Sequence, residues 1–413
     1  MYSKTIKIKC DKNTKLDMNY FIKYNTNMNE NIINKEKNKE INENKILLFH
    51  NKIWNDFRKI CNSYELVNII LNNKNEGISL KRPLSRSYYK MTEIIQDYKI
   101  IEYLNNEFNS INNISLLAEA PGGFLESLND TLGNKVNYYA ISLIKNDNNN
   151  VPNWNYAMKK YNKNNNIHFL LGKDNTGNIY NLCNIFNFIN TIGRNSCELI
   201  TADGGIDFSN DYLNQEQLFY RLFLCEITLA LSLQKVGGVF ICKIFDFNTI
   251  ISIKLIYLLN LVYDEVLITK PTISRDANSE KYLVCKNFKE KLNFGLLKIL
   301  YKTILNWEYN NLNVVDIFDI NIPKSFISSL EYYGLLLYKR QEKSFKYIKN
   351  LYLNLTKKKL YNILNNQIKT SFNWCKKYNI DIEHNSIFLK YNLNTIIKNH
   401  YHDLLLFKFN KLK

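Results

Sequence analysis

The hydrophobic positions of this chain follow different spacings in successive segments. Over residues 46–70 they recur mostly every three or four residues, and a second such stretch runs from about Ser87 to Ile101, so two amphipathic helices are expected. Residues 1–45 are instead dominated by Asn, Lys and Glu with little periodicity. This composition predicts a weakly ordered basic arm before the first helix.

Short apolar runs alternate with helical stretches in the middle of the chain. The expected strands are residues 115–120, 136–143, 167–172, 198–203, 238–245, 265–269 and 282–288. A long apolar-periodic helix is expected from Gln215 to Leu233, with Gly237 and Gly238 as its stop signal. Continuous apolar strands separated by helices favour a largely parallel sheet with helices on both faces, which is a doubly wound α/β fold.

Beyond residue 292 the strand signals fade, and Leu, Ile, Tyr and Phe recur at helical spacing. We therefore expect an N-terminal arm over 1–45, an α/β domain with N-terminal helices over 46–292, and a mainly helical C-terminal region over 293–413.

Composition and charge narrow the class of protein. Hydrophobic residues make up 46% and aromatic residues 14% of the 413 residues, which excludes a disordered chain. With 55 Lys and Arg against 38 Asp and Glu, the net charge of +17 favours a polyanionic partner such as nucleic acid or an anionic membrane surface. No run of about 20 apolar residues exists, and the cysteines and histidines lack metal-ligand spacing, so we expect neither a membrane segment nor a metal site.

Residues 115–124 read as a strand that enters a glycine turn and then a helix. Ligands bind at the carboxyl edge of the strands in an open α/β sheet, and glycines let a ligand approach the backbone closely. The segment is neither GxGxxG nor GxxxxGK[ST], so it lacks the signature of a dinucleotide or a P-loop site.

Three charged residues stand inside the expected strands or at their ends. Asp203 closes a strand just before a glycine turn, Lys243 lies inside an expected central strand, and Glu280 stands at the entrance of another strand. An unpaired ammonium group is costly to bury, so Lys243 needs a carboxylate partner or a function.

Taken together, the motifs at 120–124, 202–205, 240–243 and 274–282 resemble, in order and spacing, the FtsJ-like ribose 2′-O-methyltransferases. The resemblance covers roughly residues 80–290, and it is greatest to the mRNA cap-specific branch, including the relatives encoded by large DNA viruses such as asfarviruses. It implies a Rossmann-like methyltransferase fold, an enzyme that methylates RNA ribose, and S-adenosylmethionine as cofactor.

The resemblance also implies a catalytic Lys-Asp-Lys-Glu tetrad. Asp203, Lys243 and Glu280 match its last three members, and Lys90 stands where the first is expected. A ribose hydroxyl needs a base to accept its proton, and a lysine can serve if its pKa falls toward neutrality. Burial and the nearby Lys90 would lower the pKa of Lys243, while Asp203 and Glu280 would raise it. We therefore assign Lys243 as general base and the other three as positioning groups.

The cofactor-binding residues are also implied by the resemblance. Those expected around S-adenosylmethionine are Glu119, Ala120, Pro121, Gly122, Gly123, Phe124, Ser142, Leu143, Asp174 and Asp203. Asn178 stands where cap-type relatives tend to carry Asp, so we assign Asp174 as its substitute near the adenine.

Alternatives to a cap methyltransferase remain at this stage: a ribosomal or transfer RNA ribose methyltransferase, or an inactive RNA-binding scaffold. A cap enzyme would also need a pocket for methylguanosine, in which aromatic stacking combines with acidic groups. RNA, most of all capped mRNA, is the expected partner, with a capping-machinery protein or a second copy bound through the C-terminal helices. The resemblance places the protein in the cytoplasm, or in a virion or viral factory if its source is viral. Lys81, Arg82, Arg86, Lys270 and Arg275 are expected to form a basic RNA surface.

Overall fold

The computed structural model describes residues 5–7, 19–25, 51–145, 151–206, 214–289, 294–309 and 313–406. The chain divides into two compact units. Unit 1 comprises Met1–Lys35, Ser87–Pro271 and Glu280–Leu335, and unit 2 comprises Glu36–Arg86, Thr272–Ser279 and Leu336–Lys413. Each unit is therefore assembled from segments that are distant in the sequence.

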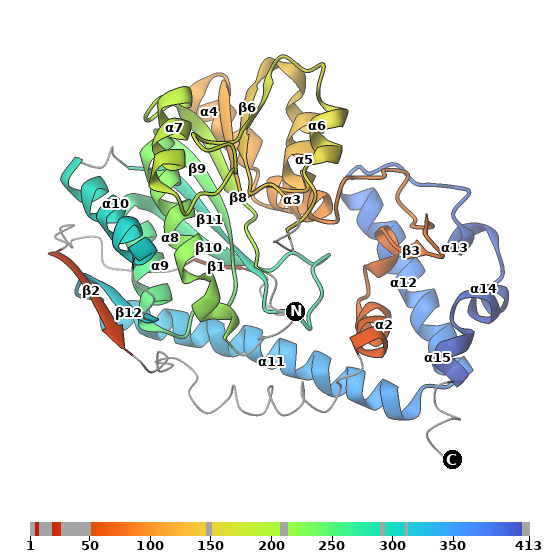
Figure 1. The fold of residues 1–413 in the computed structure, drawn as a ribbon. Helices are drawn as coiled ribbons and strands as arrows, with labels where there is room; N and C mark the ends of the chain where they lie inside the picture. Colours follow the sequence, from red (N-terminus) through yellow and green to blue (C-terminus); the bar gives the residue numbers. More distant parts are fainter. Residues whose placement is uncertain are drawn as a thin grey trace. The chain divides into compact units, whose positions relative to one another are not determined.

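Unit 1 is built on an eight-stranded sheet (Figure 1). Its strands, in their order across the sheet, are β1 (Thr5–Lys7), β10 (Tyr263–Thr269), β11 (Lys281–Phe288), β9 (Gln234–Ile244), β8 (Cys197–Ala202), β5 (Asn113–Leu117), β6 (Asn137–Ile141) and β7 (Ile167–Leu170). The strands from β9 to β7 run parallel, while β11, β10 and β1 pair antiparallel. Every strand expected from the sequence is present.

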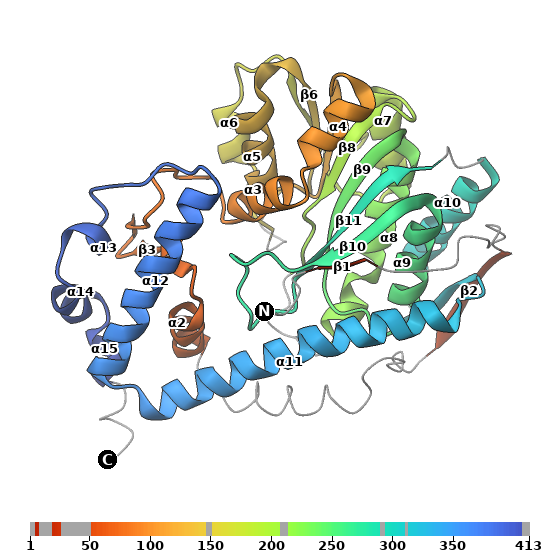
Figure 2. The same ribbon diagram turned by 180° about the vertical axis from the view of Figure 1, so that it is seen from behind.

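Helices cover both faces of this sheet, as Figures 1 and 2 show. One face carries α3 (Ser87–Asp97), α4 (Ile100–Phe108), α5 (Gly123–Leu132) and α6 (Asn155–Lys160). The other face carries α7 (Leu182–Ile192), α8 (Gln215–Leu233), α9 (Ile250–Val262) and α10 (Phe294–Tyr309). The expected doubly wound, Rossmann-like α/β fold is confirmed.

Local geometry differs from the expectation at two helices. The helix expected from Ser87 to Ile101 is divided into α3 and α4, because Lys99 takes a left-handed conformation with φ of 50°. Helix α8 ends at Leu233, as expected, but strand β9 begins at once with Gln234. Gly237 and Gly238 therefore lie inside a strand, and the interpretation of this pair as a helix stop was wrong.

The segment expected as an N-terminal arm contains strands, although most of it lies outside the described residues. Strand β1 pairs antiparallel with β10 at the edge of the main sheet. Strand β2 (Asn19–Asn25) pairs with β12 (Asn313–Asp319) in a separate two-stranded sheet. Edge strands as polar as these carry no continuous apolar run, so the sequence pattern missed them.

The boundary expected at residue 292 falls inside unit 1. Helix α10 packs against α8, where Leu300 and Ile304 are fully buried and the hydroxyl groups of Tyr301 and Ser232 are 2.8 Å apart. Burial of this apolar helix face joins the segment to the α/β unit.

Unit 2 is mainly helical. Its elements are α2 (Asn51–Cys61), the short 3₁₀ helix η1 (Glu65–Val67), the hairpin of β3 (Ile70–Leu71) and β4 (Lys74–Asn75), and α12 (Lys357–Lys377), α13 (Ile387–Lys390), α14 (Leu393–His400) and α15 (His402–Leu406). The long helix α11 (Lys324–Asn354) contributes residues to both units. None of the helices in the described ranges is both long enough and apolar enough to span a bilayer.

Candidate active site

The charged residues expected at the site meet at one edge of the unit 1 sheet. Asp203 directly follows β8, and Lys243 is next to the last residue of the parallel strand β9. Strand β11 runs antiparallel to β9, so its start lies at the same edge, and Glu280 immediately precedes it. Lys90 comes from α3. The strand directions thus bring together side chains that are far apart in the sequence.

Lys243 is held by Asp203. Its Nζ donates to the Asp203 carbonyl oxygen at 2.7 Å and lies 3.2 Å from Asp203 Oδ1. The two side chains are only 12% and 13% exposed. The buried Lys243 therefore has the carboxylate partner that its burial requires, at the same edge of the sheet.

Glu280 and Lys90 form a second ion pair, with 2.5 Å between Lys90 Nζ and Glu280 Oε1. Together with Asp203 and Lys243, these residues make up the charged centre of the site. The Lys270 ammonium group donates to the Glu280 carbonyl oxygen at 2.8 Å. Glu280 is thus placed by contacts from α3 and from the end of β10.

Tyr282 links the two ion pairs. Its hydroxyl group lies 3.1 Å from Asp203 Oδ1 and 2.9 Å from Glu280 Oε1, and its Cα pairs with that of Lys243 across β11 and β9. The site residues expected from the sequence did not include Tyr282. The signal for it was present, because a residue two positions after Glu280 on a strand points to the same face.

The charges of the centre shift the pKa values of its members. Burial works to lower the pKa of Lys243, but the carboxylates of Asp203 and Glu280 outweigh it and hold this pKa above the usual 10.5. Burial works to raise the pKa of Glu280, but the ammonium groups of Lys90 and Lys243 lower it to about 2. In this state Lys243 is protonated and Glu280 is ionised, so the expected fall of the Lys243 pKa toward neutrality does not occur here.

The glycine turn follows β5 at the same edge. Gly122 has a φ of 107°, a left-handed conformation that favours glycine, and it caps the N-terminus of α5. The Ala120 N–H donates to Ser142 Oγ at 3.0 Å, which ties this turn to the residue after β6. The Phe124 ring lies 5.9 Å from the Tyr282 ring. The turn expected to hold the cofactor is therefore joined to the charged centre.

Glu119 is buried in this turn. Its Oε1 accepts a hydrogen bond from the Leu125 N–H at 2.8 Å, while its Oε2 is buried without a hydrogen-bond partner in the described part of the chain. Burial raises the pKa of Glu119 well above its ordinary value. An orphaned buried oxygen of this kind accommodates a ligand that brings a hydrogen-bond donor.

Asp174 and Asn178 organise the loop after β7. Asp174 Oδ1 accepts hydrogen bonds from the Thr176 hydroxyl group at 2.7 Å, from the Thr176 N–H at 2.9 Å and from Asn184 Nδ2 at 2.8 Å. These contacts lower the pKa of Asp174, that of the Thr176 hydroxyl group most of all. Asn178 Oδ1 accepts from the Tyr180 N–H at 2.9 Å. Leu143, half-buried, precedes this region. The contact of Asp174 with adenine stays a prediction, and its carboxylate has a structural function in the loop.

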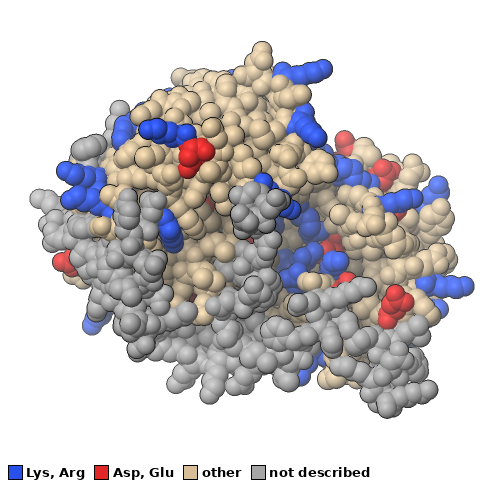
Figure 3. Space-filling view, in the orientation of Figure 1, with Lys and Arg blue, Asp and Glu red and all other residues tan. Residues whose placement is uncertain are grey.

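The expected basic RNA surface is largely committed to internal contacts. In unit 2, Arg86 and Arg275 both pair with the buried Glu65, at 3.6 and 2.5 Å. In unit 1, Lys270 is 3% exposed. Three of the five residues are therefore held by internal contacts, whereas Arg82 is exposed and Lys81 half-buried, so the RNA surface stays a prediction. Other Lys and Arg side chains are spread over the face seen in Figure 3.

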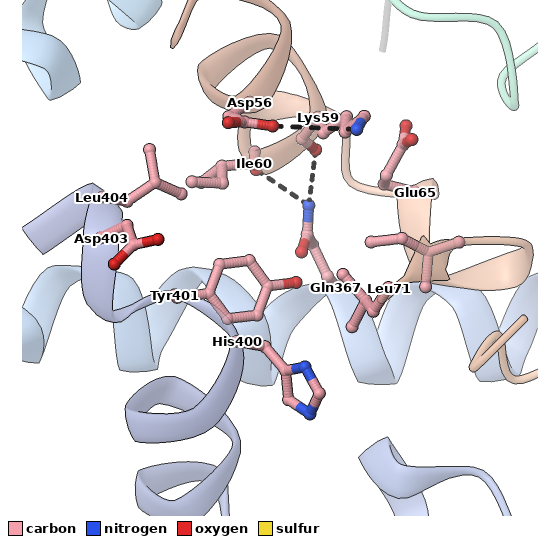
Figure 4. A pocket seen from close by; sticks show the side chains of 11 residues that line it. Asp56, Lys59, Ile60, Glu65, Leu71, Gln367, His400, Tyr401, Asp403 and Leu404 are labelled. Carbon is pink, nitrogen blue, oxygen red and sulfur yellow. Dashed lines mark hydrogen bonds and ion pairs between the residues drawn. The ribbon is translucent and has the colours of Figure 1, made fainter. Parts of the chain in front are cut away.

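Unit 2 contains a cavity of about 430 Å³. Its lining combines aromatic, acidic and amide groups, among them Tyr401, Asp56, Glu65, Asp403, His400 and Gln367. Figure 4 shows the Gln367 amide pointing to the end of α2, where Nε2 donates to the Ile60 carbonyl oxygen at 2.8 Å. None of the residues expected from the sequence as a site lines this cavity.

The sequence of this chain is similar to known proteins. Residues 83–288 match the family described as FtsJ-like methyltransferase. The cap-specific mRNA (nucleoside-2′-O-)-methyltransferase 1 of Dictyostelium discoideum is 33% identical over 214 residues, which are 48% of this chain and 28% of that protein. The cap-specific mRNA (nucleoside-2′-O-)-methyltransferase 2 of Mus musculus is 30% identical over 255 residues, which are 60% of this chain and 33% of that protein.

This chain matches only about a third or less of the length of each of these two curated relatives. Among solved structures, fibrillarin of Aeropyrum pernix with bound S-adenosyl-L-methionine aligns with 54% of this chain and 83% of its own, at 12% identity and a TM-score of 0.34.

Proposed function

Residues 83–288 are an FtsJ-like methyltransferase domain, and from this premise we propose that the chain transfers a methyl group from S-adenosylmethionine to the ribose 2′-hydroxyl of the cap-proximal nucleotide of mRNA. The observation that carries the proposal is the convergence of Lys90, Asp203, Lys243 and Glu280 at the carboxyl edge of the sheet, beside the glycine turn. Two lysines and two carboxylates at one ligand-binding edge suit proton transfer from a hydroxyl group.

The residues of the glycine turn fit the cofactor. The orphaned Glu119 Oε2 can accept a hydrogen bond from the ammonium group or the ribose hydroxyls of S-adenosylmethionine. Gly122 leaves the backbone open to close approach. Ser142 and Phe124 border the same turn, and Leu143 and Asp174 follow from the next strands. When bound, the cofactor supplies a methyl group on a positively charged sulfur, which becomes a neutral thioether as the carbon–sulfur bond breaks.

Lys243 serves as the general base in this proposal. The ribose 2′-oxygen forms the new bond to carbon, and its proton passes to Lys243 Nζ, which must be a neutral amine at that moment. Asp203 and Glu280 hold the pKa of Lys243 high in the isolated protein. A positive charge brought to the centre acts in the opposite direction and lowers this pKa. When a positive charge is bound at the centre, Lys243 can therefore become the neutral amine that accepts the proton.

The other members position Lys243 and the ribose. Asp203 orients the lysine through its carbonyl and carboxylate oxygens, and Tyr282 holds Asp203 and Glu280 at a constant separation. Lys90 neutralises Glu280. This arrangement places the acceptor nitrogen before the substrate arrives, which reduces the entropy cost of reaching the reactive geometry.

Capped mRNA is the substrate we propose, since both curated relatives above carry cap-specific names. Methylguanosine is a positively charged aromatic base, which an aromatic ring and carboxylates accommodate. The cavity of unit 2 offers that combination in Tyr401, Asp56 and Asp403, so we propose it as the site of this base.

In the experiment, the purified protein and radiolabelled S-adenosylmethionine are incubated in separate reactions with capped RNA, with the same RNA uncapped, and with ribosomal or transfer RNA. The methylated nucleotide is then mapped. Transfer to the first transcribed nucleotides of capped RNA alone supports the proposal. Equal transfer to uncapped or ribosomal RNA would favour a ribosomal or transfer RNA enzyme, and no transfer to any RNA would favour the inactive scaffold. Binding of a capping protein or a second copy through the C-terminal helices stays a prediction.

A further inference from the structure

Glu226 lies behind the charged centre, on helix α8, and is fully buried. Its Oε2 accepts a hydrogen bond from the Cys242 thiol at 3.5 Å, and Cys242 precedes Lys243 on β9. Successive residues of a strand point to opposite faces, so Cys242 faces α8 while Lys243 shares the other face with Tyr282. Only the thickness of β9 separates Glu226 from the face that carries Lys243.

The other carboxyl oxygen of Glu226 lies against the glycine turn that follows Asp203. Its Oε1 is buried under the Gly204 backbone, whose N–H works to lower the pKa of Glu226, and no ion pair among the described residues includes Glu226. A Cβ atom added to Gly204 would lie only 2.0 Å from this oxygen. Glycine at position 204 therefore lets the turn after Asp203 pass directly over the acid.

The charged and titratable groups that lie near enough to act on Glu226 come from three neighbouring elements. They are Lys243 and Cys242 on β9, Asp203 at the end of β8, and Tyr180 in the loop before α7, whose ring the Arg221 guanidinium covers at 4.3 Å. Burial raises the pKa of Glu226 to about 8, against the opposing effect of Lys243. Glu226 is thus mainly protonated at neutral pH.

We propose that Glu226 is a positioning residue of the centre, which keeps its proton during methyl transfer and so leaves Lys243 facing two carboxylates rather than three. An ionised Glu226 adds to the negative charge that holds the proton on Lys243. Its loss of a proton therefore opposes the role of Lys243 as base. The functional part of this inference rests on the proposed methyl transfer.

The test compares Glu226→Gln with Glu216→Gln. Glutamine keeps the size of the protonated acid but cannot ionise. Glu216 is a matched control, because it is also buried on α8 with a raised pKa, but it accepts hydrogen bonds from the Asn248 and Thr249 N–H groups at 3.0 and 2.9 Å, away from Lys243. Single-turnover rates on capped RNA are measured for both variants and the wild type from pH 6 to pH 10.

The ratio of the Glu226→Gln rate to the wild-type rate is expected to rise by roughly threefold or more between pH 7 and pH 9, because only the wild type gains a charge that disfavours neutral Lys243. The ratio for Glu216→Gln is expected to stay constant over this range. A constant ratio for Glu226→Gln would overturn the proposal, since a purely structural role leaves the pH profile unmoved.

A second measurement does not depend on activity. A carboxyl group whose pKa is raised by folding stabilises the protein at low pH and loses that contribution as pH rises through the folded pKa. The melting temperature of Glu226→Gln relative to wild type is therefore expected to increase from pH 5 to pH 8. A difference that is the same at both values would overturn the proposal, whether or not any RNA is methylated. Absence of methylation with all RNAs would instead contradict the proposed function.

Discussion

Lys90 and Glu280 form an ion pair of 2.5 Å although 190 positions separate them in the sequence. The pair joins α3 to the start of β11, and thereby closes one side of the charged centre. The side chains are only 17% and 13% exposed, so water screens their interaction weakly.

Replacement of Lys90 by Met should reduce methyl transfer by about 100-fold and the free energy of unfolding at pH 7 by about 2 kcal/mol, because a buried carboxylate loses its partner. The pKa of Glu280 is lowered to about 2 in the wild type, so its stabilising contribution is present above its ordinary pKa of 4.5 and is lost as pH falls toward 2. The stability difference between variant and wild type should therefore shrink from pH 7 to pH 3 in denaturant titrations.

Lys99→Met is the control for this variant, because Lys99 also pairs with a glutamate but is 72% exposed. It should change neither property measurably. Full methyl transfer by Lys90→Met would show that the lysine is no part of the centre.

Replacement of Lys243 by Met or Arg should abolish nearly all methyl transfer while S-adenosylmethionine still binds. Arginine does not give up its proton, so it cannot accept one from the ribose. Transfer rate, cofactor affinity by calorimetry and melting temperature are the measurements. A Lys243→Met variant that is active and more stable than the wild type would mean that the lysine has only a structural role, since removal of a buried charge can stabilise a protein.

Replacement of Tyr282 by Phe should lower the transfer rate by about tenfold, because Asp203 and Glu280 lose the hydroxyl group that joins them. The ring remains, so the melting temperature should change little. Tyr263→Phe is a matched control on β10, where a buried hydroxyl bonds to Gln234 Oε1 at 3.0 Å away from the centre. Equal effects of the two variants on transfer would exclude a special role for Tyr282.

Replacement of Gly122 by Leu should abolish S-adenosylmethionine binding, measured by calorimetry, because a side chain at this position enters the turn that we propose for the cofactor. Gly133→Leu separates this effect from backbone strain. Gly133 also has a positive φ, of 67°, but no atom lies within 4 Å of an added Cβ. Undiminished cofactor affinity in Gly122→Leu would contradict the proposed position of the cofactor.

Replacement of Asp403 by Asn should weaken binding of capped RNA several-fold and leave binding of uncapped RNA unchanged, because the cavity loses negative charge toward a cationic base. Asp381→Asn is the control, since Asp381 is an exposed acid of unit 2 that does not line the cavity. Filter binding with both RNAs at constant salt is the measurement. If both RNAs lose affinity equally, the cavity does not recognise the cap.

The sequence alone determined the α/β unit. Its central strands are continuous apolar runs, because a strand that is buried on both faces needs apolar side chains at successive positions, whichever elements it packs against. The same reasoning identified Lys243 and Asp203, because a lysine inside an apolar strand and an acid at the end of another are local features. The FtsJ-like family, identified from motifs, is confirmed for residues 83–288.

Only the tertiary structure decided which distant residues meet. The partner of Lys90, the link that Tyr282 makes and the buried acid Glu226 depend on strand order, on the antiparallel start of β11 and on the packing of α8. The tertiary structure also joined residues 36–86 and 336–413 in one compact unit and committed Arg86 and Arg275 to Glu65. Periodicity records which face of an element is buried, but it does not record what that face is buried against.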